Sequence, residues 1–154
     1  MTPINIEYNG YLITTDKALL QPEAIHRWLS EESYWSKHIP FSVVKTAFDH
    51  SYCIGVLKDG VQVGYARFVT DYATFAYLAD VYVEEAHRGQ GLSKKMMEVL
   101  MELGWVKGLR RIMLATLDAH GLYEQFGFTA PAIPERCMEI TRPVIYGDKE
   151  SALR

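Results

Sequence analysis

The chain has 154 residues and a formal net charge of −3, and 49% of its residues are hydrophobic while 23% are charged. These values are typical of a globular protein with one hydrophobic core, so we expect a single domain over residues 1–154. The weakly negative charge gives no basic field that would favour nucleic acid, which we therefore exclude as a partner.

The sequence also bears on the cellular compartment. The first residues lack a basic region followed by an apolar run, and no apolar stretch approaches the ~20 residues that a transmembrane helix needs. Cys53 and Cys137 are the only cysteines, form no CxxC pair and lie in strand-like surroundings, which is typical of buried free thiols. We expect a cytoplasmic protein with no membrane partner.

The N-terminal half predicts strands and helices that lead into an antiparallel meander. Pro22 suits the first turn of a helix, and the apolar residues that follow it recur at helical spacing. Asp59-Gly60 is a hairpin signal between two strand-like runs. The expected strands cover residues 11–15, 52–57, 61–70 and a run that starts at Phe75, and the expected helices start at Pro22 and cover 41–48.

The segment 77–95 carries the most informative pattern. It reads as a strand that ends at Val83, a polar turn, Arg88-Gly89-Gln90-Gly91-Leu92-Ser93, and a helix whose apolar period begins at Leu92. A loop that enters a helix leaves several backbone N–H groups without intrahelical partners, and the helix dipole adds partial positive charge there. Because glycine lets the backbone approach a ligand closely, the turn can hold a phosphate or pyrophosphate, with Arg88, Lys94 and Lys95 around it. The alternative is an ordinary strand-to-helix connection that needs two glycines.

Two common glycine loops do not fit this turn. A P-loop requires a glycine, four further residues and then Gly-Lys-Ser/Thr, and a dinucleotide fingerprint requires a third glycine where Lys94 stands. The phosphate therefore belongs to another kind of cofactor. A metal site is a poor interpretation, because Glu84, Glu85 and His87 lack defined ligand spacing.

The remaining chain predicts a crossover and a short helix. The helix from Leu92 and a strand over 111–116 follow the central strand, which implies a right-handed crossover and a parallel strand pair. A helix over 119–126 is expected next, with Asp118 as its N-cap. The last expected strand covers 137–141.

In this order, two motifs resemble those of the GNAT superfamily of N-acetyltransferases. Residues 88–93 are similar to the family's acetyl-coenzyme A motif, Arg/Gln-x-x-Gly-x-Gly/Ala, with Ser93 in place of the final glycine or alanine. Leu122-Tyr123-Glu124-Gln125-Phe126-Gly127-Phe128 resembles the family's Leu-Tyr-x-x-x-Gly-Phe segment. The resemblance is firmest over 75–128. It implies a GNAT-like α/β fold with a mixed, mostly antiparallel sheet, a central parallel strand pair and helices on both faces.

The resemblance also implies a cosubstrate and residues that hold it. Acetyl-coenzyme A would bind without a metal, with its pyrophosphate cradled beside Arg88 by Gly89, Gln90, Gly91, Leu92, Ser93 and Lys94. Val81, Tyr82 and Val83 would offer backbone groups to the pantetheine arm and the thioester. Tyr123 matches the family tyrosine that often protonates the leaving thiolate, the alternative being a core tyrosine. Asp118 stands roughly where many relatives have an asparagine that contacts the cofactor.

The general base and the acceptor site stay open. Asp80 is a charged residue within an otherwise apolar strand, and it is either functional or faces a polar side of the sheet. His120 lies three residues before Tyr123 on nearly the same helix face, and histidine exchanges protons near neutral pH, although a lone histidine is more often structural. Tyr34 and Trp35 either cap the core or wall the acceptor site, since this segment often covers that site in GNAT folds.

The implied activity is acyl transfer. Such a reaction needs a neutral amine, hydrogen bonds to the developing oxyanion and a stabilised leaving thiolate. The resemblance implies an N-acyltransferase that moves an acetyl group from acetyl-coenzyme A to a primary amine of a small molecule, by direct attack in a ternary complex. The alternatives are a coenzyme A-binding sensor without catalysis, a protein N-acetyltransferase and an interaction domain. The acceptor, the acyl-chain preference and the oligomeric state stay open, although homodimers are common among such domains.

Overall fold

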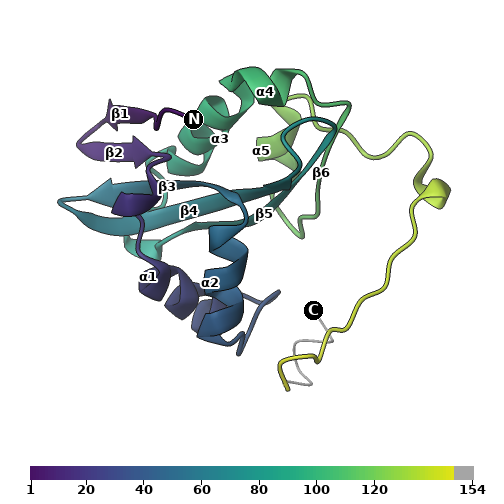
Figure 1. Ribbon diagram of the computed structural model, residues 1–154, viewed down its shortest axis with the longest axis horizontal. Coiled ribbons are helices and arrows are strands. Elements are labelled where there is room, and N and C mark those ends of the chain that lie inside the picture. Colours follow the sequence, from purple (N-terminus) through teal and green to yellow (C-terminus); the bar gives the residue numbers. More distant parts are fainter. Residues whose placement is uncertain (148–154) are drawn as a thin grey trace.

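The fold is built on one six-stranded sheet whose spatial order equals the order of the strands in the chain, as Figure 1 shows. The computed structural model describes residues 1–147; residues 148–154 of the domain expected from the sequence lie outside this range. β1 to β5 are antiparallel, and only β5 and β6 run parallel. The strands are β1 (Asn5–Tyr8), β2 (Tyr11–Thr14), β3 (Tyr52–Lys58), β4 (Val61–Thr70), β5 (Phe75–Val83) and β6 (Arg111–Leu114).

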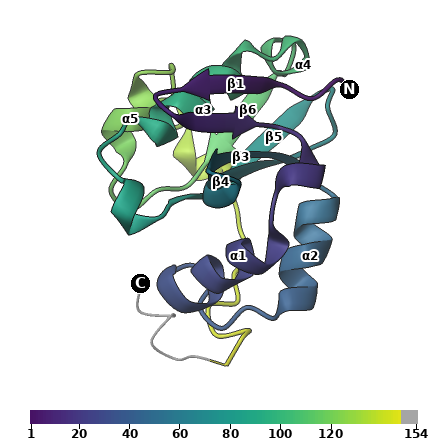
Figure 2. The ribbon, with the colours of Figure 1, turned by 90° about the vertical axis from the view of Figure 1, so that its left-hand side faces the viewer.

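Helices cover both faces of the sheet, as the views in Figures 1 and 2 agree. On one face lie α1 (Pro22–Arg27), continued by a π-helical turn over Trp28–Glu32, and α2 (Phe41–Asp49). On the other lie α3 (Leu92–Glu102), α4 (Gly104–Lys107) and α5 (His120–Glu124). The mixed, mostly antiparallel sheet with a parallel pair and two helical layers confirms the predicted fold class.

Each helical layer seals its own hydrophobic cluster against the sheet. Beneath α3, the buried side chains include Ile54, Phe68 and Met96. On the opposite face, Trp28 and its neighbours in α1 and α2 pack with Tyr65 of β4. Burying a large apolar side chain stabilises the folded state by about 1.5–3 kcal/mol, so these two clusters hold the helices to the sheet.

The structure confirms most expected elements and corrects others. β1 was not expected from the sequence, because two of its four residues are exposed and the other two only partly buried, so its apolar signal is weak. The expected strand over 137–141 is wrong, because these residues pair with no other strand in the described chain. Cys53 is buried as expected, whereas Cys137 is exposed, contrary to expectation. A strand-like sequence forms a strand only where a partner edge reaches it.

The predicted cap of the last helix is also wrong. Ala119, not Asp118, is the N-cap residue of α5, and no side chain of that residue bonds to the helix. The Thr116 hydroxyl instead accepts a hydrogen bond of 3.0 Å from the Ala119 backbone N–H. Within residues 1–147 no helix is long and apolar enough to cross a membrane.

Candidate active site

The site begins where the two parallel strands separate. β5 pairs with β6 only from Phe75 to Leu78, opposite Arg111 to Leu114. β6 then ends, while β5 continues to Val83 with a partner on its β4 side alone. After residue 78, the backbone groups of β5 that point away from β4 therefore have no strand partner, which is the arrangement that binds an extended ligand by β-strand-like hydrogen bonds. Val81, Tyr82 and Val83 of the sequence prediction all lie in this open stretch.

A bulge in β5 re-aims one acidic side chain. The pairing of β4 with β5 shifts register between Tyr65 and Arg67, opposite Tyr82 and Ala79. Asp80 lies inside this shift and has a φ of +55°, in the left-handed region that few non-glycine residues adopt within a strand. Bulges turn side chains out of the regular alternation and are common beside active sites. Asp80 is thus held in its place by backbone conformation as well as by its partners.

Asp80 is at the centre of a polar cluster that joins three elements. Its Oδ2 accepts a hydrogen bond of 2.7 Å from Arg67 Nε of β4, and its Oδ1 accepts one of 2.9 Å from Trp35 Nε1. The Arg67 side chain is 18% exposed and that of Asp80 is 10% exposed, so this ion pair is largely withdrawn from water. Arg67 Nη1 also donates to Ser51 Oγ over 3.0 Å. Both carboxylate oxygens already accept a hydrogen bond. The arrangement therefore favours a role for Asp80 in positioning Trp35, and not a role as a free general base.

The sequence analysis missed Arg67. A signal was present, because Arg67 and Asp80 are opposite charges inside two neighbouring apolar strands of a predicted meander. The strand register, which the sequence does not specify, brings them together.

The glycine turn, residues 88–94, follows the end of β5 and opens α3. Gly89 and Gly91 have φ of +80° and +75°, so both positions require the left-handed conformation that glycine adopts without strain. Arg88 Nε donates to the Val83 carbonyl over 2.9 Å, which ties the turn to the strand. Gly91 is the N-cap of α3 without a side-chain cap, and Lys95 N–H is the donor to its carbonyl. The N–H groups of Leu92, Ser93 and Lys94 are thereby the orphan donors of the helix, as the phosphate hypothesis requires.

The hairpin of β1 and β2 contacts the glycine turn and the residue before it. Tyr8 of β1 donates from its hydroxyl to the Gln90 carbonyl over 3.2 Å, and a Cβ added at Gly91 would lie 3.1 Å from the same hydroxyl. The Tyr11 hydroxyl of β2 lies 2.9 Å from His87 Nδ1. Neither contact is visible in the sequence, because each spans more than 70 residues. The shape of the turn therefore depends on two tyrosines from the start of the chain.

The glycine turn is largely exposed, with Leu92 as its one buried residue. Arg88, Gly89, Gln90, Gly91 and Lys94 are exposed, whereas Leu92 is buried in the core beneath α3. Leu92 can therefore contribute only its backbone N–H to a ligand, while its side chain anchors the first helical turn.

Tyr82 presents its side chain to the opposite face. Its ring stacks on Trp28 with a centroid distance of 5.1 Å, and its buried hydroxyl has no hydrogen-bond partner within the described residues. Burial, followed by the nearby Glu32 carboxylate, raises the pKa of Tyr82 to about 12. Any contact between Tyr82 and a ligand in the gap between β5 and β6 would therefore come from its backbone.

Tyr123 is held in α5, in the hydrophobic cluster that also contains the end of β5. Its ring is buried in the cluster that contains Val83 and Leu92, and it meets the Phe128 ring edge-on at 6.0 Å. Burial raises the pKa of Tyr123 to about 12, and the nearby Asp118 carboxylate and Tyr34 phenol add to the effect. The phenol consequently keeps its proton over the whole physiological range. His120, at the first position of α5, lies one helical turn from it.

The predicted acceptor residues connect the two halves of the site. Tyr34 lies close enough to Tyr123 to influence its ionisation, and the Tyr34 ring meets Trp35 edge-on at 5.0 Å. Trp35 in turn donates to Asp80. The structure thus joins Tyr34, Trp35 and Asp80 by direct contacts, places Tyr34 near enough to Tyr123 to affect its ionisation, and sets the glycine turn beyond the end of β5. No cluster of three or more metal-ligating side chains occurs in residues 1–147.

The comparisons with known proteins agree with this geometry. The profile of the acetyltransferase (GNAT) family matches residues 22–128. A Gibberella zeae protein that carries the name acetyltransferase is 34% identical over 142 residues, which cover 79% of this chain and 80% of that protein. A thialysine N-epsilon-acetyltransferase of Bos taurus is 36% identical over 73 residues, which cover 42% of this chain and 43% of that enzyme.

Solved structures give the same result. A Xanthomonas campestris protein described as belonging to the GNAT family is 47% identical, covers 92% of this chain and 100% of its own, and superposes with a TM-score of 0.88. A Staphylococcus aureus protein at 19% identity and a TM-score of 0.69, covering 86% of this chain and 98% of its own, shares the fold. The chain belongs to the GNAT family of acetyltransferases.

Proposed function

We propose that this protein transfers an acetyl group from acetyl-coenzyme A to a primary amine of a small molecule, by direct attack in a ternary complex. One observation carries the proposal: the open backbone of β5 is followed, after a short turn, by an uncapped helix N-terminus, and a buried, protonated Tyr123 packs in the same hydrophobic cluster as Val83 and Leu92. GNAT enzymes generally use acetyl-coenzyme A, and membership of the family makes this chain a transferase.

The residues present fit the cosubstrate. The N–H groups of Leu92, Ser93 and Lys94 face outward from an uncapped helix start, where the helix dipole favours a pyrophosphate. The positive φ angles of Gly89 and Gly91 shape the turn, and Arg88 adds charge beside it. The open edge of β5 at Val81 and Val83 would pair with the amide groups of the pantetheine arm.

Proton balance assigns the side-chain roles. Acyl transfer from a thioester to an amine forms a C–N bond and breaks a C–S bond, so the amine loses a proton and the departing sulfur gains one. Tyr123 holds a proton at its buried hydroxyl, and we assign it to the sulfur. We assign Asp80 to holding Trp35 at the acceptor side and not to taking the proton of the amine. His120 is then the remaining candidate for the group that takes this proton.

The acceptor site suits a small amine. Two aromatic rings, Tyr34 and Trp35, stand beside each other, and aromatic faces attract cations, while the charge of the neighbouring Asp80 is already balanced by Arg67. The thialysine N-epsilon-acetyltransferases of Bos taurus and Sus scrofa are, by name, enzymes that acetylate an amine, although each match covers less than half of either chain.

A binding titration with a matched glycine pair tests the proposal. Gly89 and Gly60 have φ of +80° and +78°, and neither has an atom within 4 Å of an added Cβ, so Gly89→Glu and Gly60→Glu impose equal backbone strain at two distant turns. We expect acetyl-coenzyme A to bind wild type and Gly60→Glu in calorimetry, and Gly89→Glu to lose binding because its carboxylate repels the pyrophosphate. Equal binding by both variants would remove the cosubstrate from the glycine turn.

An amine panel then separates enzyme from sensor. Wild type is incubated with acetyl-coenzyme A and amines that include thialysine, lysine, diamines and a peptide N-terminus, and the released thiol is measured. Saturable, amine-dependent thiol release supports the transferase. Tight cosubstrate binding without release for any amine would leave a coenzyme A-binding module, and release with the peptide alone would indicate a protein acetyltransferase.

A further inference from the structure

The side chain of Tyr82 lies between the cosubstrate side of the site and the acceptor side. Tyr82 is 7% exposed, and its buried hydroxyl has no hydrogen-bond partner within the described residues. Buried polar groups nearly always have a partner, because an unpaired one has lost its hydration without compensation. The position of the exception is informative, since β5 here joins the glycine turn to the layer of α1 and α2.

Arg88 connects this tyrosine to the glycine turn. Its Nε donates to the Val83 carbonyl over 2.9 Å, and its Cζ lies 5.6 Å from the centre of the Tyr82 ring. The guanidinium therefore rests against the end of β5. A pyrophosphate at the uncapped start of α3 would compete for it, because a guanidinium binds phosphate oxygens more strongly than it binds an aromatic face.

Glu32 connects the same tyrosine to the acceptor side. The Tyr82 ring stacks on Trp28 at an interplanar angle of 21°, and Trp28 begins the π-helical turn that ends at Glu32. Such turns are rare and are frequent at functional sites. Burial is the main cause of the raised pKa of Tyr82; the Glu32 carboxylate raises it further and the Arg88 guanidinium lowers it, so both charges act on the hydroxyl.

The π-helical turn is tied to the segment that carries Tyr34 and Trp35. Ser33 Oγ donates to the Leu29 carbonyl over 2.7 Å and accepts a hydrogen bond of 3.0 Å from the Ser36 backbone N–H. Ser33 is buried, so water does not compete for these bonds. A displacement at the end of the turn is therefore passed on to the two aromatic rings.

We infer that Tyr82 is a positioning residue that makes the arrangement of Tyr34 and Trp35 depend on an occupied glycine turn. A pyrophosphate at the turn draws Arg88 away from Tyr82, and the released hydroxyl donates to the Glu32 carboxylate. This bond fixes the end of the π-helical turn and with it the two rings. The amine then binds the loaded protein more tightly than the empty one. The inference rests on the proposed function, because it requires coenzyme A to bind at the turn.

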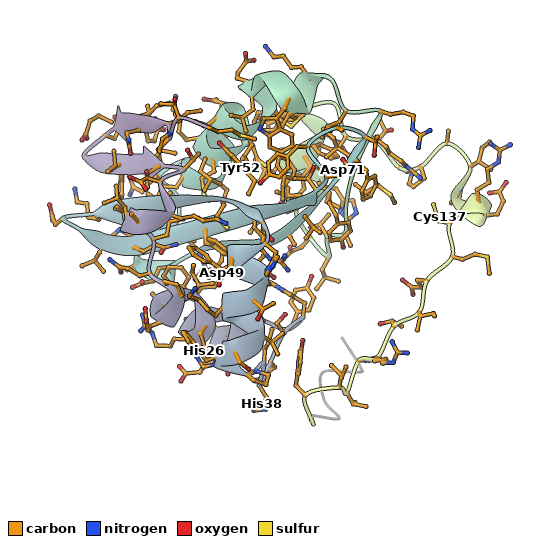
Figure 3. The ribbon with its side chains drawn as sticks, viewed as in Figure 1. His26, His38, Asp49, Tyr52, Asp71 and Cys137 are labelled. Carbon is orange, nitrogen blue, oxygen red and sulfur yellow. The ribbon has the colours of Figure 1, made fainter. Side chains whose placement is uncertain are left out.

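Fluorine NMR with coenzyme A as the probe tests this coupling. The three tryptophans, labelled as 5-fluorotryptophan, give three resonances, which Trp35→Phe and Trp105→Phe assign. Trp105 is the internal reference, because it packs against Tyr52, which Figure 3 shows on the opposite face of the sheet from His38. We expect saturating coenzyme A to shift the Trp28 and Trp35 resonances of wild type and to leave that of Trp105 in place.

Two variants and a matched control identify the residues. Tyr82→Phe keeps the stacked ring and removes only the hydroxyl, and Glu32→Ala removes the acceptor. In both we expect coenzyme A to bind in calorimetry without shifting the Trp35 resonance. Glu31→Ala removes the neighbouring exposed carboxylate, which is not among the groups that change the pKa of Tyr82, and should respond as wild type does.

The outcomes separate this inference from the proposed function. If wild type binds coenzyme A and the Trp35 resonance does not move, the inference is overturned and the proposed function stands. The same holds if the shift persists in either variant or is lost in Glu31→Ala as well. If one variant does not fold, the other decides alone. Wild type that binds no coenzyme A refutes the proposed function and the inference together.

Discussion

The Arg67–Asp80 pair provides the most quantitative test of the site. Arg67→Met keeps the length of the side chain but leaves the Asp80 carboxylate with Trp35 as its only partner, at a position where its side chain is 10% exposed. Removing one partner of a buried ion pair costs about 3–5 kcal/mol, and the remaining exposure reduces our expectation to about 2–4 kcal/mol. Asp80→Asn removes the charge while keeping a residue that tolerates positive φ.

A double-mutant cycle isolates the interaction. Either single variant already removes most of the interaction between the two side chains. The loss of unfolding free energy in the double variant, measured in urea, should therefore be smaller than the sum of the two single losses by about 1–3 kcal/mol. The exposed pair Lys45–Asp49 on α2 is a control of similar distance, 2.6 Å, with side chains 45% and 46% exposed. Its coupling should stay below about 0.5 kcal/mol. A coupling for Arg67 and Asp80 no larger than that of the control would refute the description of this cluster as a buried pair that holds Trp35.

Further predictions follow from single residues. Tyr123→Phe should lower kcat by about 100-fold or more while leaving acetyl-coenzyme A affinity unchanged, as expected for loss of a general acid, and equal turnover would refute the assignment. Because burial raises the pKa values of Tyr82 and Tyr123 from 10.0 to about 12, the free energy of unfolding should fall as pH rises from about 10 to about 12, where the unfolded chain ionises first; a flat profile in denaturant titrations at fixed pH would contradict this. Tyr8→Phe removes one hydrogen bond behind the glycine turn and should weaken acetyl-coenzyme A binding roughly 2- to 10-fold in calorimetry, with unchanged affinity counting against the support. A thiol reagent should modify the exposed Cys137 of the folded protein but reach Cys53, whose pKa burial raises, only after denaturation.

The elements that the sequence predicts well have local signals. Asp59-Gly60 marks the β3–β4 hairpin, and the change of period at Leu92 marks the start of α3, because both depend on neighbouring residues alone. The glycine turn belongs to the same class, since two positive φ angles need two glycines at fixed places.

The features that the sequence does not predict depend on distant partners. The contact of Tyr8 with Gln90 and that of Trp35 with Asp80 join residues whose proximity follows from the completed sheet. The expected strand over 137–141 is a different case: its alternation is strand-like, but the local sequence supplies no partner edge, and these residues form no strand. The cap of α5 failed for a third reason: the helix begins one residue later than expected, so Ala119 and not Asp118 stands at the N-cap, and spacing alone does not fix a helix start to one residue.

The order of the strands has a consequence for how the protein is made. Because β1 to β6 lie side by side in the order of synthesis, each strand that leaves the ribosome finds its partner edge already formed. The sheet can therefore grow one strand at a time, with short loop closures up to β5 except between β2 and β3, where α1 and α2 intervene. The elements that contact the glycine turn, which are β1, β2, β5 and α3, have all been synthesised once α3 has emerged, before β6 exists. We expect a nascent chain that ends after Gly108 to contain the assembled turn, whereas the gap beside β5 acquires its second wall only when β6 arrives.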